Sequence, residues 1–393
     1  MNRILYIGIH HRKNDPRLFY REIRLIKNKF PKSDIYIITR RSVNNSSKPV
    51  IHFSEELTVD NNIVNHIEIQ YDNLQNMGIL AKLKHKMKTG MYYLRICKEL
   101  NADVIQASDA RELLSSLIIA KVSGAKTIYD SHEDYVRQIL DYQKKSVKTY
   151  LLALKLFLYE FLFIRFYDIV FCTDEFLLDK YKKMQYSAKS VNILRNFPYI
   201  EDKHKKKFQD KDTLKLVYIG GVNEHRGVIE CANYVEKFNE NHIEKKLIFD
   251  VFSPPNEITE ELVKKGFINH TSWIDYKDLM ELLKSYDVGV CLWHPIKKFY
   301  RNLPLKNFDY MGSGLPIITS NFGNLKRHMD KSDAGICIDP LNYSDFENAI
   351  IKLFDPQNRE KYSENGIYYS KSEASFQNEG KRYAEFIEKR LEN

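Results

Sequence analysis

The chain has 393 residues, of which 43% are apolar and 29% are charged, as in an ordinary soluble globular protein. This length exceeds what one hydrophobic core usually serves, so we expect two domains of roughly 150–200 residues each. Five scattered cysteines, none in a C-x-x-C pair, argue against a disulfide framework and a zinc site, and they predict a reduced cytosolic chain.

Short apolar runs alternate with helical patterns along the whole chain. In the first half, strands are predicted at residues 3–9, 34–39, 103–107, 126–130, 168–173 and 191–194. In the second half, strands are predicted at residues 214–220, 247–252, 287–292, 316–320 and 335–339. Amphipathic helical segments lie between most of them, as at residues 15–30, 276–286 and 343–354. This alternation predicts an α/β fold with parallel sheets covered by helices on both faces.

A polar, charge-dense segment at residues 195–213 separates the two series and is the predicted linker. We therefore predict two doubly wound, Rossmann-like domains, 1–200 and 201–370, and a C-terminal helical segment, 371–393, that returns to the first domain. Ligands of such sheets bind outside the carboxyl ends of the strands. Two domains of this kind, face to face, would form a cleft for two substrates.

The most hydrophobic stretch lies at residues 150–170. Lys155, Glu160 and Arg165 interrupt it, so it is too short an apolar run for a membrane-spanning helix. The N-terminus starts with a charged, strand-like segment and shows no cleavable signal. We therefore expect a cytoplasmic protein in which residues 150–170 form a buried or half-buried helix.

The net charge of +9 is moderate, but basic residues gather in the first half. Residues 82–98 interleave basic and apolar side chains, and Lys144, Lys145 and Lys148 follow. This pattern suits an anionic membrane surface or a phosphorylated acceptor, but a solvated helix face explains it as well. Nucleic acid is not an expected partner, because no nucleic-acid motif accompanies the charge.

The segment "YIGGVNEHRGV" follows the first strand of the second half. Gly220 and Gly221 would let backbone amides approach an anion closely, Arg226 supplies a permanent positive charge, and Gly227 relieves packing where a helix begins. These features suit a diphosphate. A plain strand-to-helix turn would carry the same glycines.

A second motif, "LPLKNFDYMGSGLPI", predicts a short helix that ends at Gly312–Gly314. Lys306 and Asp309 are three residues apart and therefore share one helix face. A surface ion pair would explain this spacing. A lysine beside a phosphate and a carboxylate on a ribose diol would explain it equally well.

In combination, three motifs resemble those of GT-B glycosyltransferases of the retaining family 4. They are the pattern LP-x-K-x-F-D/E-Y-M-x-x-G-x-P-I at residues 303–317, the GG…RG loop upstream and "YDSHE" at residues 129–133. The resemblance spans nearly the whole chain. It implies a GT-B enzyme that moves a sugar, with retention of configuration, from a UDP- or GDP-sugar to a hydroxyl acceptor. We expect no metal and no cofactor, because no D-x-D-like ligand set follows a predicted strand and cationic side chains can do the work of a metal.

The resemblance assigns roles to individual residues. It implies donor-binding roles for Gly220, Gly221, Arg226, Lys306, Asp309, Asn321 and Gly323. Asp309 would bind the ribose hydroxyls, while Arg226 and Lys306 would neutralise the departing diphosphate. His132 would reach the donor sugar near the reacting centre, although local loop contacts could also explain a histidine there. Asn321 and Gly323 would line the donor pocket, with a simple loop turn as the alternative.

The loops after two strands of the first domain supply the expected acceptor contacts. These are His10, His11, Arg12, Arg17 and Asp109. Asp15 and Pro16 also give the first loop a purely structural explanation, as a helix cap followed by a first-turn proline. Two departures from the family weaken the phosphate contacts: Arg301 stands where many members have a glutamate, and Gly221 where many have an arginine.

The acceptor is expected to be lipid-linked or a polysaccharide, in the assembly of a bacterial surface polysaccharide at the inner face of the membrane. Two alternatives stay open. A nucleotide-sugar 2-epimerase of the same fold would rely on carboxylates such as Glu133 or Asp15. A non-catalytic partner subunit would keep the fold for binding alone.

Overall fold

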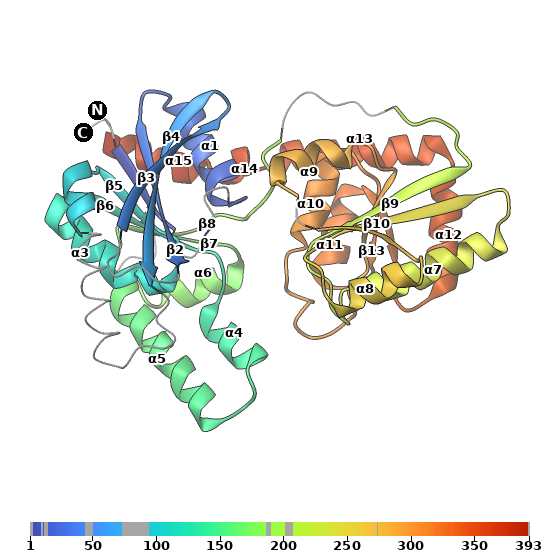
Figure 1. The fold of residues 1–393 in the computed structure, drawn as a ribbon, viewed down its shortest axis with the longest axis horizontal. Coiled ribbons are helices and arrows are strands. Elements are labelled where there is room, and N and C mark those ends of the chain that lie inside the picture. The colour runs from blue at the N-terminus through green and yellow to red at the C-terminus, as the bar shows by residue number, and fades with distance from the viewer. Residues whose placement is uncertain are drawn as a thin grey trace. The chain divides into compact units, whose positions relative to one another are not determined.

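The computed structural model describes residues 3–8, 11, 15–43, 50–72, 94–185, 190–200, 207–272 and 274–391. The chain divides into two compact units (Figure 1). The first unit comprises residues 1–196 and 379–393, and the second comprises residues 197–378. The C-terminal helix therefore belongs to the same unit as the N-terminal strands.

The first unit is built on an eight-stranded sheet of order β3-β4-β2-β1-β5-β6-β7-β8. Its strands are β1 (Arg3–Ile7), β2 (Asp34–Val43), β3 (Val50–Val59), β4 (Asn62–Asp72), β5 (Val104–Ala107), β6 (Lys126–Ser131), β7 (Ile169–Cys172) and β8 (Val191–Ile193). All pairs are parallel except β3 and β4 at one edge. These two strands form a hairpin around Asp60 and Asn61, whose φ angles are 46° and 65°.

Helices and helical turns surround this sheet. They are η1 (Leu18–Ile23), α1 (Arg24–Lys29), η2 (Ala110–Glu112), α3 (Leu113–Ser123), α4 (Tyr135–Tyr142), α5 (Val147–Phe163), η3 (Ile164–Phe166), α6 (Glu175–Lys182) and α15 (Lys381–Leu391). Leu5 and Ile7 of β1 pack into a buried apolar cluster with β2, β4 and β5. Between them, Tyr6 is bonded through its hydroxyl to the hydroxyl of Tyr383 on α15, at 2.7 Å. This alternation along β1 follows from the two-residue period of a strand.

The second unit contains a six-stranded, fully parallel sheet of order β11-β10-β9-β12-β13-β14. Its strands are β9 (Thr213–Ile219), β10 (Lys246–Phe252), β11 (Asn269–Thr271), β12 (Val288–Cys291), β13 (Ile317–Ser320) and β14 (Gly335–Ile338). Its helices are α7 (Val228–Asn241), α8 (Glu257–Lys264), α9 (Tyr276–Leu283), α10 (Leu305–Gly312), α11 (Gly323–Ser332), α12 (Tyr343–Phe354), α13 (Pro356–Ser372) and α14 (Phe376–Glu379), which ends at the unit boundary.

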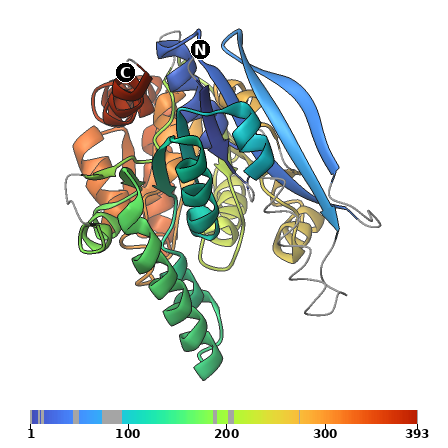
Figure 2. The ribbon, with the colours of Figure 1, turned by 90° about the vertical axis from the view of Figure 1, so that its left-hand side faces the viewer.

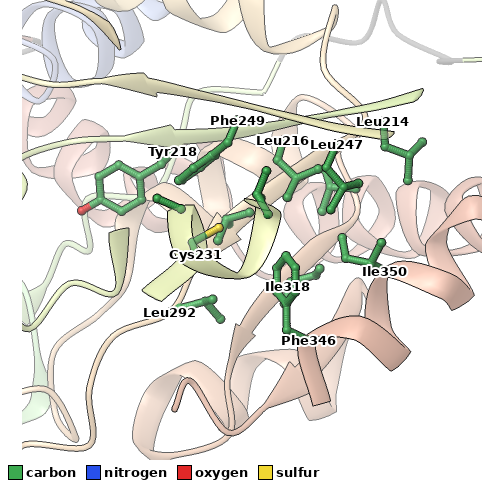
Figure 3. Packing of buried hydrophobic residues seen from close by; sticks show 14 of the residues in the cluster. Leu214, Leu216, Tyr218, Cys231, Leu247, Phe249, Leu292, Ile318, Phe346 and Ile350 are labelled. Carbon is green, nitrogen blue, oxygen red and sulfur yellow. The ribbon is translucent and has the colours of Figure 1, made fainter. Parts of the chain in front are cut away.

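Both faces of this sheet are buried. Leu214, Leu216 and Tyr218 of β9 pack in a cluster that includes residues of α7 and α12 (Figure 3). The intervening Val217 and Ile219 pack in another cluster, with residues of α10 and α13. A parallel strand buried on both sides explains the apolar run from Leu216 to Ile219, while Lys215 near the start of the strand is exposed.

The structure confirms the predicted fold class, two Rossmann-like α/β units, and each strand predicted from the sequence is present. The β3–β4 hairpin and the short β11 were not predicted. Four of the five cysteines are buried and all five are free, as expected of small core residues.

The prediction for residues 150–170 needs correction. A helix does form, but it spans Val147–Phe163, and only Thr149, Ala153 and Glu160 within it are buried. Most of its large apolar side chains face outward instead of into a core. None of the helices in the described part of the chain is long and apolar enough to cross a membrane.

Candidate active site

In the second unit, the predicted donor residues lie near one end of the sheet, at the point where the strand order reverses. β9 has β10 on one side and β12 on the other, so the chain changes direction across the sheet between these strands. The segments that follow β9, β12 and β13 carry all seven predicted donor residues. A crevice at such a switch point is where doubly wound sheets bind ligands.

The loop after β9 is shaped by glycines. Gly220 has a φ of +110° and donates its N–H to Phe252 O at 2.9 Å. Gly227 has a φ of +68°, and a Cβ there would lie 1.7 Å from the carbonyl oxygen of Leu292. Only glycine fits at that position, because backbone from the segment after β12 fills the space. The two loops are therefore held in close contact.

Arg226 folds back over this loop. Its Nη1 donates to Gly221 O at 3.2 Å, and the same carbonyl oxygen accepts a hydrogen bond of 2.8 Å from the hydroxyl of Tyr218. The Nε of Arg226 is buried and has no hydrogen-bond partner in the described part of the chain. Part of the guanidinium is thus left available to an anion.

Helix α10 is docked firmly on the strands beside the loop. The hydroxyl of Tyr310 accepts from Ile219 N at 3.1 Å, and the Tyr310 ring occupies the space above Gly289, where a Cβ would approach it to 2.5 Å. Asn307 donates to the hydroxyl of Thr319 at 3.1 Å. These contacts fix the helix that carries Lys306 and Asp309.

Lys306 is the most unusual residue of the site. Its ammonium lies 3.4 Å from the ring centroid of Tyr218 and 3.5 Å from the position that a Cβ of Gly220 would take. The side chain is buried, and Nζ has no hydrogen-bond partner among the residues that the structure describes. Burial, and to a lesser extent the charge of Arg226, lower the pKa of Lys306 to about 7.

Asp309 lies on the same helix and is also buried. Its Oδ1 accepts a hydrogen bond of 2.7 Å from the hydroxyl of Tyr276 on α9. Since Nζ of Lys306 has no hydrogen-bond partner, the surface ion pair that the spacing allowed does not account for this motif. The buried lysine with its uncompensated charge calls for a chemical explanation.

The segment after β13 carries the last two predicted donor residues. Asn321 is exposed and donates its backbone N–H to Ile338 O at 2.8 Å. Gly323 has a φ of +54°, and a Cβ there would lie 2.5 Å from the carbonyl oxygen of Tyr300. Close packing therefore accounts for Gly323 without a ligand, whereas Asn321 keeps its side chain at the surface.

In the first unit, His132 follows β6 and is held by a buried carboxylate. His132 Nε2 lies 2.6 Å from Asp130 Oδ2, and Arg17 Nε donates to the same oxygen at 2.7 Å. Arg17 Nη2 also bonds Asp130 Oδ1 and donates to Leu194 O at 3.0 Å. The histidine ring is thereby fixed at the carboxyl end of its strand.

The charges and hydrogen bonds of this cluster determine the protonation state of His132. Burial raises the pKa of Asp130, but the charge of Arg17 and the hydrogen bonds from Arg17 and His132 lower it by more, so that carboxylate is ionised. Burial, together with the Arg17 charge, lowers the pKa of His132. A neutral His132 therefore carries its proton on Nε2, toward Asp130, and leaves Nδ1 as an acceptor.

Further buried polar groups continue the network away from His132. Arg17 Nε lies 3.0 Å from Glu22 Oε1, Gln106 donates to Glu22 Oε2 at 2.6 Å, and the Tyr383 hydroxyl donates to Gln106 Oε1 at 2.7 Å. Burial and the nearby Asp130 charge raise the pKa of Glu22. The network thus ties the C-terminal helix to the histidine loop.

Glu22, Asp130 and His132 also place possible metal ligands within 4.8 Å of one another. The guanidinium of Arg17 already bonds both oxygens of Asp130 and pairs with Glu22. A metal ion would meet this fixed positive charge, so the donor set fits an internal ion-pair network better than a metal.

Two of the predicted acceptor residues, His10 and Arg12, lie outside the described residues. His11 packs edge-on against His132, with ring centroids 5.0 Å apart, and its Nδ1 lies 3.2 Å from Asp15 Oδ2. Burial lowers the pKa of His11, but its hydrogen bond to Asp15 and the charges of nearby carboxylates more than offset this and raise it.

The side chains of Arg17 and Asp109 are buried and are bonded to other residues of the protein. Arg17 is 3% exposed and its guanidinium is engaged with Asp130 and Glu22, which argues against the predicted acceptor contact. Asp109 is buried and accepts hydrogen bonds from the backbone and side chain of Arg111. It begins the helical turn η2 as its cap.

Sequence reasoning missed three residues that organise the site. Tyr218 lies under the Lys306 ammonium, Tyr276 bonds Asp309, and Asp130 holds His132. Asp130 had a signal, since it stands two residues before the histidine at the end of a predicted strand. The two tyrosines come from β9 and from helix α9, and no local pattern links them to Lys306 or Asp309.

Comparison with known proteins gives a family model that matches part of the second unit and solved structures that share the fold of the chain. Residues 205–356 match the family model for glycosyl transferases group 1. This range contains the glycine loop, Arg226, Lys306 and Asp309. No curated protein sequence matches the chain.

Several solved structures share the fold over nearly the whole chain. Sucrose-phosphate synthase from Thermosynechococcus elongatus is similar with a TM-score of 0.64 and 11% identity, over 99% of each chain. HepE from Anabaena, solved in complex with UDP-glucose, gives a TM-score of 0.61 and 12% identity, over 98% of this chain and 99% of that one. An α,α-trehalose-phosphate synthase (UDP-forming) from Burkholderia xenovorans, solved with glucose-6-phosphate, gives a TM-score of 0.61 and 10% identity, over 99% of this chain and 100% of that one. The predicted GT-B fold is confirmed by these likenesses.

Proposed function

We propose that this chain, which has the GT-B fold and a group 1 glycosyltransferase domain over residues 205–356, is a retaining glycosyltransferase that uses a nucleotide diphosphate sugar. One observation carries the proposal. The buried ammonium of Lys306 has no hydrogen-bond partner and lies beside Arg226 and the glycine loop. A diphosphate would supply the missing negative charge, and the glycines leave room for its oxygens.

UDP is the first nucleotide to test. HepE was solved with UDP-glucose, and the trehalose-phosphate synthase is described as UDP-forming. Asp309 would accept hydrogen bonds from the ribose hydroxyls, in addition to or in place of its bond from Tyr276. A GDP-sugar stays the second candidate, because no described contact reads the base.

In the proposed reaction, the bond between the anomeric carbon and the diphosphate oxygen breaks, and a bond to the acceptor oxygen forms on the same face of the sugar. The acceptor proton passes to the departing phosphate oxygen, and a nucleoside diphosphate leaves. Arg226 and Lys306 would stabilise the charge that develops on the diphosphate. His132, with Nε2 turned to Asp130, would offer Nδ1 to a hydroxyl of the donor sugar.

The acceptor is proposed to be a lipid-linked or polysaccharide hydroxyl in the assembly of a bacterial surface polysaccharide. The basic segment that suggested this in the sequence, residues 82–98, is described only from residue 94 onward. Radiolabelled sugar transfer to membrane extracts, followed by extraction into organic solvent, would separate a lipid-linked product from a polymer.

A thermal-shift panel with UDP, GDP, ADP and their common sugar conjugates tests the donor site directly. UDP or UDP-sugars should raise the melting temperature by mass action. The shift should disappear in Lys306→Met and in Asp309→Asn, and should persist in Lys331→Met, which removes an exposed lysine from the same unit. An undiminished shift in Lys306→Met would overturn the assignment of the diphosphate site.

Product analysis distinguishes the two alternatives that the fold leaves open. A 2-epimerase would change the sugar of its donor without an acceptor, which NMR of the nucleotide sugar detects. A non-catalytic subunit would bind the nucleotide sugar and leave it intact in the presence of every acceptor fraction. The proposed transferase should release UDP only when an acceptor is added.

A further inference from the structure

Helix α5 exposes a continuous apolar face, which we call the α5 face. It consists of Val147, Tyr150, Leu151, Leu154, Phe157, Leu158, Phe161 and Leu162, whose exposed fractions run from 36% to 76%. In Figures 1 and 2, α4 and α5 extend together beyond the sheet of the first unit. Isolated exposed apolar residues are ordinary, but a contiguous patch of this kind marks an interaction surface.

The orientation of α5 is fixed by contacts on its opposite side. Thr149, Ala153 and Glu160 are buried, and Glu160 Oε2 accepts a hydrogen bond of 2.8 Å from Lys180 on α6. The hydroxyl of Tyr159 accepts from Leu114 N at 3.2 Å. The α5 face repeats at intervals of three and four residues, so these anchors hold all its members on the outer side.

The charges on α5 and on the turns at its ends have one sign, apart from one buried glutamate. On the adjacent helix α4, Asp141 is paired with Arg137 at 3.3 Å. Between residues 143 and 166 the basic residues are Lys144, Lys145, Lys148, Lys155 and Arg165, and the only acidic residue is Glu160. Glu160 is buried and paired with Lys180, so it contributes no exposed negative charge. The four lysines are exposed, and the Arg165 guanidinium lies 4.1 Å from the ring centroid of Phe161.

We propose that the α5 face binds an anionic lipid bilayer and lies in the interface plane. An apolar stripe rich in leucine and phenylalanine, flanked by lysines, inserts among acyl chains while the ammonium groups contact lipid phosphates. The 17-residue helix is about 25 Å long, which suits an in-plane position. The proposal depends on α5 alone and would stand if the proposed reaction were wrong.

A second copy of the chain fits this surface less well. Pairing of two α5 faces would bring lysines of both copies together, and the helix offers no exposed carboxylate to compensate them. An anionic bilayer satisfies the apolar stripe and the positive flank at the same time. The charge pattern therefore selects the lipid surface.

Flotation of the full chain with vesicles tests this proposal. The chain should float with phosphatidylcholine vesicles that contain phosphatidylglycerol, and less with pure phosphatidylcholine or at high salt. Leu151→Glu/Leu158→Glu should lower the bound fraction at least about tenfold, because it places two charges in the stripe. Lys144→Gln/Lys145→Gln/Lys148→Gln should weaken binding to the anionic vesicles only.

Ile243→Glu is the matched control, since Ile243 is 98% exposed in the second unit and should leave flotation unchanged. The variants should fold, because the substituted side chains are exposed, and their melting temperatures check this. Equal flotation of wild type and Leu151→Glu/Leu158→Glu would overturn the proposal. Absence of flotation of the wild type would also overturn the proposal. If a second copy covered the face instead, the wild type should sediment as a dimer, and this double variant should dissociate it.

Discussion

Lys306 combines an energetic cost with a binding capacity. Its ammonium is buried beside the ring of Tyr218, without a hydrogen-bond partner, and its pKa falls to about 7. The ring compensates only part of the lost hydration, since a desolvated cation–π contact contributes about 2 kcal/mol. A residue held at such a cost is typical of a functional site.

Lys306→Met should therefore stabilise the unliganded protein at low pH. The side-chain pKa is 10.5 in the reference state and about 7 when folded. Below pH 7 the lysine is charged in both states and the burial cost is complete, whereas between pH 7 and about 10 stability rises with pH. We expect Lys306→Met to gain about 1–3 kcal/mol in urea unfolding at pH 6 and less at pH 9. A loss of stability at pH 6 would contradict the burial argument.

Binding of a nucleotide sugar should take up a proton. A diphosphate beside Lys306 favours the charged ammonium and so raises its pKa in the complex. Affinity for UDP-glucose should fall above pH 7, approaching about tenfold per pH unit. Calorimetry in two buffers of different ionisation enthalpy measures this uptake directly. Lys306→Met should bind weakly at every pH, and an equally steep pH dependence in that variant would assign the proton to another group.

His132 is expected to affect turnover rather than nucleotide binding. All the proposed nucleotide contacts belong to the second unit, whereas His132 belongs to the first. His132→Ala should lower kcat about 10–100-fold and leave the thermal shift with UDP unchanged. Thr173→Ala is a suitable control, since Thr173 donates to the backbone carbonyl of His132 at 3.3 Å and the substitution keeps the imidazole. A lost UDP shift in His132→Ala would place the histidine's role in folding or binding.

At the scale of elements, two glycines of the loop after β9 have different expected roles, one in packing and one in binding. Gly227→Ala should be severely destabilising, by at least about 3 kcal/mol, because a Cβ would lie 1.7 Å from Leu292 O at a φ of +68°. Gly221→Ala should fold normally, since its nearest neighbour would be Arg226 Nη1 at 3.7 Å. It should still weaken UDP binding if phosphate oxygens approach the loop. Thermal unfolding with and without UDP measures both effects, and a stable Gly227→Ala would contradict the packing described here.

Most parallel strands were predictable because they are buried on both faces and read as short apolar runs. The parallel strand β11 was missed, because its residues are polar and largely exposed. The β3–β4 hairpin lies at a sheet edge, and residues 50–59 mix polar and apolar side chains in a way that an apolar-run criterion misses. Asp60 and Asn61 mark its turn, since both adopt positive φ and both residue types tolerate it. Reading turn chemistry first would have found this hairpin.

The candidate site was predictable only where its residues are near in sequence. The glycine loop and the Lys306–Asp309 helix each form a local motif, so spacing pointed to them. The position of Lys306 over Tyr218, and of Tyr276 against Asp309, depends on which strands and helices become neighbours. For Arg17, a position in the loop after the first strand gave no sign of its buried carboxylate partner, Asp130.

At the scale of the whole molecule, the chain leaves the first unit near residue 196 and re-enters it near residue 379. Helix α15 closes the first unit through Tyr383, which bonds Tyr6 and Gln106, and through Glu388, which pairs with Lys29 at 2.7 Å. Ile387 of the same helix is fully buried. Helix α15 is therefore part of the first unit's core.

Removal of residues 381–393 should destabilise the first unit selectively. The deletion exposes the surface under Ile387 and leaves the buried hydroxyl of Tyr6 without its partner. Calorimetry should show one transition lowered by several degrees, while the transition that UDP raises stays in place. The single substitution Tyr383→Phe should give a smaller change in the same direction. A uniform loss of both transitions would show that the units unfold together.

The same connectivity sets the order in which the two units can finish folding as the chain leaves the ribosome. Residues 197–378 form one uninterrupted stretch, so the second unit needs no later segment of the chain to complete its core. The first unit emerges earlier but waits for α15, and until then Tyr6 and Gln106 lack their partner. The half of the protein made first is thus the last to mature, and during that interval it is the part most dependent on chaperones.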